Sequence, residues 1–194
     1  QCEQTAGGKG CTGKQGDCGK DAATAGRQDD LARALIALAA ASGGKSSGEA
    51  NDLLMLEGLF TGITNVNFDK AAVGVLVSQV EAAARALGNE PREIRLPWEE
   101  SDPDIASLKS LVLLGLRGMA AYAHHAWVQG QRDPAVTGFF YEALAALARP
   151  GDLAWWLKMV DRTGEVNLAC MALLDRANTG SYGTPVPVTV PLTI

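Results

Sequence analysis

Three cysteines, Cys2, Cys11 and Cys18, lie near the start of the 194-residue chain, separated by eight and six residues. The residues between them are glycines, polar side chains and one alanine, with no larger apolar residue among them. A buried thiol needs apolar surroundings, so these three are not core cysteines. Glycines let the backbone turn so that several sulfur atoms can converge on one point, as a metal–sulfur cluster requires. We therefore predict a metal-ligand loop.

The spacing alone leaves the bound metal open. Structural zinc sites favour four ligands in short pairs, often with histidine, and ferredoxin-type clusters also use a short Cys-x2-Cys pair. Neither pattern occurs in this loop. A disulfide framework fits poorly, because three cysteines leave one unpaired and the rest of the chain is long and helical in pattern. An iron–sulfur cluster is favoured, with zinc and redox-sensing thiols as the alternatives.

Four ordered stretches of motifs are spread over nearly the whole chain. The first is the cysteine loop, with Cys2-Glu3-Gln4-Thr5, Gly10-Cys11-Thr12 and Cys18-Gly19-Lys20. The others are Leu59-Phe60-Thr61 with Thr64-Asn65-Val66-Asn67-Phe68-Asp69; Asp104-Ile105, Gly115-Leu116-Arg117-Gly118-Met119 and His125-Ala126; and Gly164-Glu165-Val166-Asn167-Leu168 with Leu173-Leu174-Asp175, Ala177-Asn178-Thr179 and Tyr182-Gly183. Together these stretches resemble a single family, the hybrid cluster proteins, also called hydroxylamine reductases.

The resemblance implies a cofactor and an activity. Cys2, Cys11 and Cys18 would bind a 4Fe–4S cluster, with 2Fe–2S as the alternative, and the amides of Gly10 and Gly19 would be available to its sulfur atoms. In the family, electrons from an NADH-linked or ferredoxin-type reductase enter at this relay cluster. They pass to a hybrid 4Fe–2O–2S cluster, where hydroxylamine is reduced to ammonia; reduction of nitric oxide is also attributed to the family.

The chain departs from the family in two ways. The family loop has a Cys-x2-Cys pair, of which Cys2 is the second member, and the first would precede Gln1. Family members have three domains, and the hybrid cluster is bound by the second and third. A length of 194 residues supports one domain at about 100–200 residues each. The chain is therefore expected to be a fragment or a stand-alone relative, inactive alone, whose partners include the remaining domains.

Composition and charge argue against several classes of partner. The net charge of −5 and the lack of a basic stripe argue against nucleic-acid binding. Charged residues interrupt the apolar runs before they reach membrane-spanning length, so no membrane contact is expected. Free thiols beside a cluster suggest the cytoplasm, with an organelle stroma or matrix as the alternative. The competing functional class is a non-catalytic helical interaction module whose cysteine loop holds zinc or nothing.

Helical periodicity dominates and predicts an all-α fold. Helices are expected over 29–41, 49–63, 70–87, 102–128, 133–148, 152–160 and 164–177, and the apolar circumference of 102–128 predicts that it is the central and most buried helix. The resemblance implies two packed three-helix bundles. We expect a ligand loop at 1–26, a helical domain at 27–181 and an extended linker at 182–194 toward a missing Rossmann-like domain.

Several other conspicuous side chains have plain structural interpretations. His124 and His125 are adjacent, so on a helix they diverge by about 100° and cannot share a metal. Cys170, within an apolar helix, is expected to be an inert core residue. One tryptophan of the pair at 155–156 should point inward and the other outward. The asparagines at 65 and 67 either cap helix ends or face the active site across a domain boundary.

Overall fold

The computed structural model describes residues 16, 18–63, 66–88 and 93–189, so Cys2 and Cys11 lie outside the described residues. Within these ranges the fold has six α-helices, one short 3-10 helix and no strand, which confirms the all-α prediction. The elements are α1 (Ala22–Ala41), α2 (Glu49–Thr61), α3 (Lys70–Leu87), η2 (Pro97–Glu99), α4 (Pro103–Val128), α5 (Pro134–Leu147) and α6 (Leu153–Tyr182).

Aspartate caps start five of these six α-helices. In each case the carboxylate accepts a hydrogen bond from a backbone amide of the first helical turn, which otherwise has no partner. Asp69, Asp102 and Asp152 cap α3, α4 and α6 in this way. The two further caps are Asp21 for α1 and Asp133 for α5.

Two helix boundaries were predicted wrongly. The first helix starts at Ala22 rather than at residue 29, because Asp21 caps it and alanine has the highest helix propensity. The segments 152–160 and 164–177 form the single 30-residue helix α6, which ends at Tyr182 rather than at residue 177. Gly164 costs about 1 kcal/mol inside a helix but does not break it. Thr163 and Cys170 on either side of it are buried, so packing holds the helix continuous.

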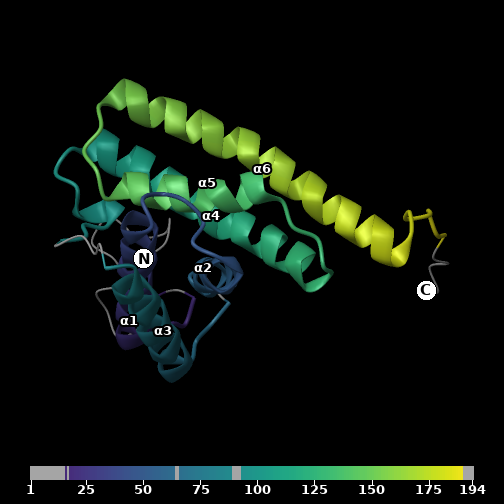
Figure 1. Ribbon diagram of the computed structural model, residues 1–194, viewed down its shortest axis with the longest axis horizontal. Helices are drawn as coiled ribbons and strands as arrows, with labels where there is room; N and C mark the ends of the chain where they lie inside the picture. Colours follow the sequence, from purple (N-terminus) through teal and green to yellow (C-terminus); the bar gives the residue numbers. More distant parts are fainter. Residues whose placement is uncertain (1–15, 17, 64–65, 89–92, 190–194) are drawn as a thin grey trace, which may run out of the picture.

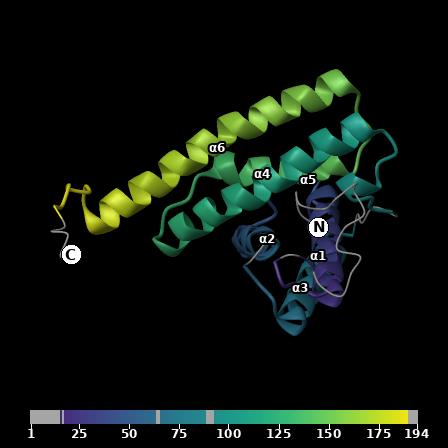
Figure 2. The same ribbon diagram turned by 180° about the vertical axis from the view of Figure 1, so that it is seen from behind.

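The helices form two groups, α1–α3 and α4–α6, which cross each other in Figures 1 and 2. Helix α1 packs most extensively against α3 and also contacts α2. Helix α4 runs beside α6 for much of its length and contacts α2, α5 and η2. Helix α5 contacts α1, α4 and α6 and so connects the groups. One continuous core joins them, and its largest fully buried side chains are Trp156, Tyr141 and Phe140.

Helix α4 is central in its contacts but is not the most buried helix, contrary to the prediction. Nine of the 14 residues of α5 are buried, against nine of the 26 residues of α4. Part of the apolar circumference of α4 instead faces outward, with Leu111 54% exposed. By length and composition α4 also could cross a membrane, but a core helix meets the same test. Two of its buried side chains, Lys109 and Arg117, are charged.

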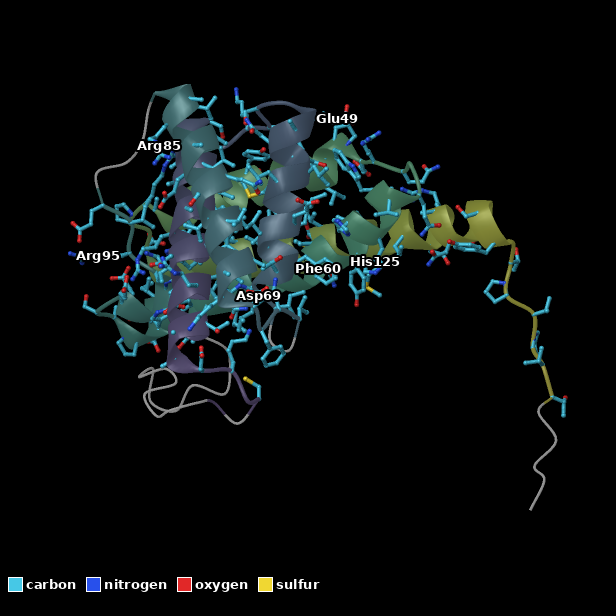
Figure 3. The ribbon with its side chains drawn as sticks, turned by 90° about the horizontal axis from the view of Figure 1, so that it is seen from below. Glu49, Phe60, Asp69, Arg85, Arg95 and His125 are labelled. Carbon is cyan, nitrogen blue, oxygen red and sulfur yellow. The ribbon has the colours of Figure 1, made fainter. Side chains whose placement is uncertain are left out.

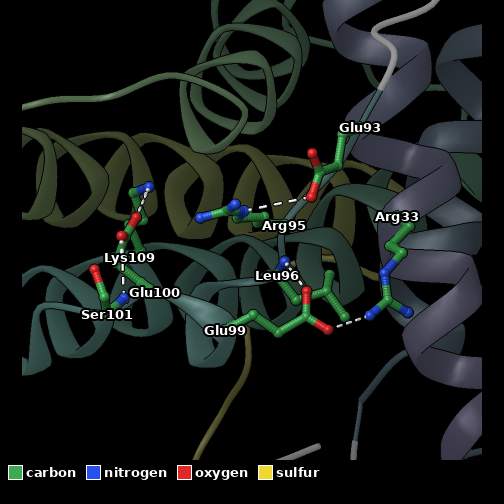
Figure 4. Close-up of polar contacts among 8 residues, drawn as sticks. All are labelled: Arg33, Glu93, Arg95, Leu96, Glu99, Glu100, Ser101 and Lys109. Carbon is green, nitrogen blue, oxygen red and sulfur yellow. Dashed lines mark hydrogen bonds and ion pairs between the residues drawn. The ribbon is translucent and has the colours of Figure 1, made fainter.

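A short polar network joins α1, η2 and the start of α4 (Figure 4). Glu99 forms an ion pair with Arg33 of α1 and accepts a hydrogen bond from the Leu96 amide at 2.8 Å. Next to it, Glu100 accepts a hydrogen bond from the buried ammonium of Lys109 at 2.7 Å. The Lys109 Nζ atom also lies 5.3 Å from the centroid of the Trp156 ring. These contacts fix the connection into α4 against both groups of helices.

Candidate metal-ligand loop

Cys18 is the one predicted cluster ligand within the described residues, and it lies in a tight turn directly before α1. The Gly16 amide donates to the Lys20 carbonyl at 2.8 Å, and the Gly19 amide donates to the Gly16 carbonyl at 2.9 Å. Gly19 has a φ of +83°, which L side chains rarely adopt. The turn holds Cys18 half-buried as a free thiol.

These hydrogen bonds correct one expectation. The Gly19 amide was expected to be available to a cluster sulfur, but in this structure it is bonded to the Gly16 carbonyl. Its contribution is therefore to close the turn that presents Cys18. Gly10, the other amide named for this role, lies outside the described residues.

Lys20 extends the turn into the interior. Its side chain is only 4% exposed, and its Nζ atom lies 5.2 Å from the centroid of the Phe68 ring, just before α3. The adjacent Asp21 caps α1: hydrogen bonds from Thr24 lower the pKa of its carboxyl group, with a smaller contribution from the charge of Lys70. A lysine is rarely buried without a specific contact, and here the contact with Phe68 joins the turn at Cys18 to the segment before α3.

The burial of Lys20 was not predicted from the sequence. A usable signal did exist, because Cys18-Gly19-Lys20 and the stretch ending in Phe68-Asp69 are two of the four segments that carry the family resemblance. Segments that keep a shared pattern while far apart in sequence are candidates for contact in the fold. The structure brings these two together through Lys20 and Phe68.

The two adjacent histidines lie on α4 against Phe60 of α2, as the labelled Phe60 and His125 show in Figure 3. The ring centroids of His124 and His125 lie 5.5 Å and 5.6 Å from that of Phe60. Their own rings are 6.2 Å apart and nearly perpendicular. The His125 Nδ1 atom lies 2.6 Å from the Ala121 carbonyl oxygen, a hydrogen bond within the helix. The arrangement is that of packed side chains.

Cys170 of α6 lies at the contact between α6 and α4. Its side chain has no exposed surface, and its thiol donates to the Met119 carbonyl at 3.3 Å. Burial raises the pKa of this thiol to about 11, so the reactive thiolate is scarce at neutral pH. The prediction of a buried core cysteine is confirmed.

The remaining predictions about single residues have mixed outcomes. Trp156 is fully buried and Trp155 is 41% exposed, which confirms the prediction for this pair. The Asn67 side chain accepts a hydrogen bond from the Asp69 amide at 2.8 Å, so it shapes the turn before α3. Asn65 lies outside the described residues.

Among the described residues, no group of three or more histidine, cysteine, aspartate or glutamate side chains could hold a metal ion. Two of the three predicted ligands, Cys2 and Cys11, lie outside those residues, so the ligand set is not tested and stays a prediction. Cys18 is the predicted ligand whose surroundings the structure describes. It is a free thiol at a glycine turn, separate from Cys170, and it suits a metal ligand better than a core role.

Comparison with known proteins identifies the family. Residues 1–194 match the Prismane/CO dehydrogenase family. The chain is 43% identical over 227 aligned positions to a hydroxylamine reductase of Syntrophobacter fumaroxidans, covering 99% of the chain and 42% of that relative. It is 42% identical to a hydroxylamine reductase of Thermodesulfovibrio yellowstonii and 36% identical to one of Methanocella arvoryzae, covering 99% of the chain in both cases and 41% and 42% of these relatives. The chain thus spans about two fifths of the length of these relatives, and it belongs to the Prismane/CO dehydrogenase family.

Proposed function

We propose that the chain is the N-terminal electron-relay part of a hydroxylamine reductase. The observation that carries this proposal is the family match over residues 1–194, which includes the whole cysteine loop. The relatives at 43% and 42% identity are both named hydroxylamine reductase. In this proposal the chain supplies the entry point for electrons, and the part of the relatives that has no counterpart here supplies the catalytic centre.

Cys2, Cys11 and Cys18 are the proposed cluster ligands, for a 4Fe–4S cluster or alternatively a 2Fe–2S cluster. The bound cluster would supply one-electron transfer. Cys18 fits this role because its thiol is free, half-buried and presented by a closed glycine turn. Cys170 does not fit, since its thiol is fully buried and bonded to the Met119 carbonyl. A fourth ligand must come from elsewhere.

The finer fold proposal is two three-helix bundles, α1–α3 and α4–α6. It is supported by the extensive packing of α1 on α3 and of α4 on α6, while α2 also packs on α4 and α5 on α1, so the proposed bundles share a large interface. We further propose the division into a ligand loop at 1–26, a helical domain at 27–181 and a linker at 182–194 leading to a Rossmann-like domain. The start of α1 at Ala22 places the last residues of that loop in the first turns of the helix.

For the intact protein we propose the reduction of hydroxylamine to ammonia at a hybrid 4Fe–2O–2S cluster outside this chain, with nitric oxide as a second proposed substrate. Its electron donor would be an NADH-linked or ferredoxin-type reductase, and its location the cytoplasm. Neither nucleic acid nor a membrane is a proposed partner. The name hydroxylamine reductase, shared by the relatives from Syntrophobacter fumaroxidans and Methanocella arvoryzae, supports the proposed activity.

Metal content tests the proposal. The 194-residue chain is purified without oxygen, reconstituted with iron and sulfide, and assayed for iron, acid-labile sulfide and absorption near 400 nm. We expect iron and sulfide in similar amounts, lost in Cys18→Ala and Cys11→Ala. Bound zinc, or a chain without metal, would instead support a helical interaction module with a zinc-binding or empty cysteine loop.

A further inference from the structure

Helices α4 and α6 run side by side in the same direction. Three close approaches mark the contact line, where the two helices meet. A Cβ atom at Gly115 would lie 2.8 Å from Thr163, the Cys170 thiol bonds the Met119 carbonyl, and Gln129 donates to Asn178 at 2.8 Å. In Figures 1 and 2, α6 forms one edge of the molecule and no other labelled helix lies beyond it.

An exposed apolar surface lies along this helix pair. On α6 the spacing of 157, 168 and 171 places three side chains on one face, and on α4 the spacing of 111 and 122 does the same. Their exposed fractions are 49%, 67%, 45%, 54% and 38% in that order. We call this surface the α4/α6 face, defined by Leu111, Tyr122, Leu157, Leu168 and Met171.

Both halves of the face lie on the side away from the rest of the fold. On α4, the buried Leu116 and Ala120 are on the opposite side of the contact line from Leu111 and Tyr122. On α6, Arg162 points toward α5, where it pairs with Glu142. Leu157, five residues earlier, is turned about 140° away from it. The α4/α6 face is therefore one surface.

The size of the face exceeds that of scattered surface leucines. From Leu157 to Met171 the helix rises about 21 Å, and packed helix axes lie about 8–10 Å apart. A footprint two helix widths across is therefore about 400 Å², and the five side chains that define the face supply its apolar part. The largest apolar patch on a typical monomer is about 300–600 Å² and is often functional. Tyr182, 81% exposed, lies on the same side of α6 near its end, beyond Asp175.

The charges on the face indicate what covers it. Asp161 and Asp175 lie at its edges on α6, and neither forms an ion pair with any residue in the described part of the chain. Suppose that α6 of a second copy packed antiparallel on this α6, with the two Leu168 side chains opposite each other. Asp161 of one copy would then face Asp175 of the other, because each lies seven residues from Leu168. Opposed like charges disfavour self-association. An apolar surface with a basic rim suits the face better.

We propose that the α4/α6 face is the docking surface for the rest of the polypeptide that the longer relatives carry, and that this segment presents an apolar surface edged by basic residues. This inference rests on the proposed function, in which the chain is one part of a longer reductase. The relatives supply such a segment, since the match covers 42% of the Syntrophobacter fumaroxidans protein and leaves more than half of it without a counterpart.

Cysteine labelling tests the proposal in two proteins. In the 194-residue chain, the variant Met171→Cys and the control variant Val75→Cys are treated with a maleimide. Val75 is a suitable control because its side chain on α3 is 60% exposed. Peptide mass spectrometry reads the labelling at each position, and both cysteines should react rapidly. In the intact Syntrophobacter fumaroxidans reductase, a cysteine aligned with Met171 should react at least about tenfold more slowly than one aligned with Val75.

Equal rates at the two positions of the intact reductase would overturn the proposal. So would a dimer of the 194-residue chain in light scattering that Leu168→Glu converts to a monomer, since it would assign the face to a second copy. Neither outcome depends on iron content. A failure of the docking proposal is therefore distinguishable from a failure of the proposed function.

Discussion

At the scale of single residues, two cysteines on the described part of the chain have opposite surroundings. Cys18 is presented by a glycine turn, whereas Cys170 is enclosed between α4 and α6. Cys170→Ala should leave iron per protein unchanged and cost about 1 kcal/mol of unfolding free energy, as a typical core substitution does. Iron analysis and urea unfolding check this. Iron loss equal to that of Cys18→Ala would place Cys170 in the ligand set.

The buried ion pair at the start of α4 gives a pH-dependent prediction. The hydrogen bond from Lys109 lowers the pKa of Glu100, and burial opposes this only in part. A carboxyl group whose folded pKa lies below its unfolded value of 4.5 stabilises the fold above that pH, and the contribution is lost as the pH falls through the folded pKa. Glu100→Gln should therefore destabilise the chain by about 1–2 kcal/mol at neutral pH.

Urea unfolding of wild type and Glu100→Gln over a pH series measures this effect. The difference between them should shrink as the pH falls from about 5 to about 3. Glu93→Gln is the matched control, because Glu93 is 75% exposed in its pair with Arg95 and such pairs contribute little. A difference that stays constant with pH would assign the effect of Glu100 to packing.

At the scale of helices, two glycines on neighbouring helices should respond oppositely to alanine. A Cβ atom added at Gly164 of α6 would meet no atom within 4 Å, so Gly164→Ala should stabilise the chain by about 1 kcal/mol through helix propensity. A Cβ atom at Gly115 of α4 would lie 2.8 Å from Thr163. Gly115→Ala should lose that gain and cost about 1–3 kcal/mol by overpacking. Shifts of the same sign in urea unfolding would contradict the packing between α4 and α6.

Helix boundaries show where sequence patterns were sufficient. Helix α3 was predicted over 70–87 and is observed at Lys70–Leu87, because Asp69 and Gly88 mark its ends locally. The break predicted between Val160 and Gly164 was wrong, since the packing of α6 on α4 outweighs the helix propensity of one glycine. Local signals determine caps, but contacts between distant segments decide whether a weak position ends a helix.

In the candidate site, too, some features could be predicted from local sequence and others depend on distant contacts. That Cys18 is not a core residue and that Cys170 is one followed from neighbouring residue types alone. The burial of Lys20 against Phe68 did not, because it depends on the packing of the loop against a segment about fifty residues away. The hydrogen bond that engages the Gly19 amide likewise depends on the closed turn and not on composition.

At the scale of the whole molecule, the described helices have an apolar core of their own, and Cys18 is not part of it. Among the described residues, thirty-three buried ones form one cluster, which begins at Leu31 in α1. Removal of metal by a chelator should therefore leave the helical circular dichroism signal largely unchanged, unlike a zinc finger, which unfolds without its metal. Loss of most of that signal would show that the loop is required for the fold.

The extent of the chain gives the last prediction. It covers about two fifths of the hydroxylamine reductases it resembles, and the family resemblance implies that the hybrid cluster is bound in the remainder. The 194-residue chain with a reconstituted cluster should accept electrons from a reduced viologen dye but should not reduce hydroxylamine. Ammonia formation is measured against free iron and sulfide as the blank and the intact Syntrophobacter fumaroxidans reductase as the positive control. Turnover above the blank would mean that this chain contains a catalytic centre of its own.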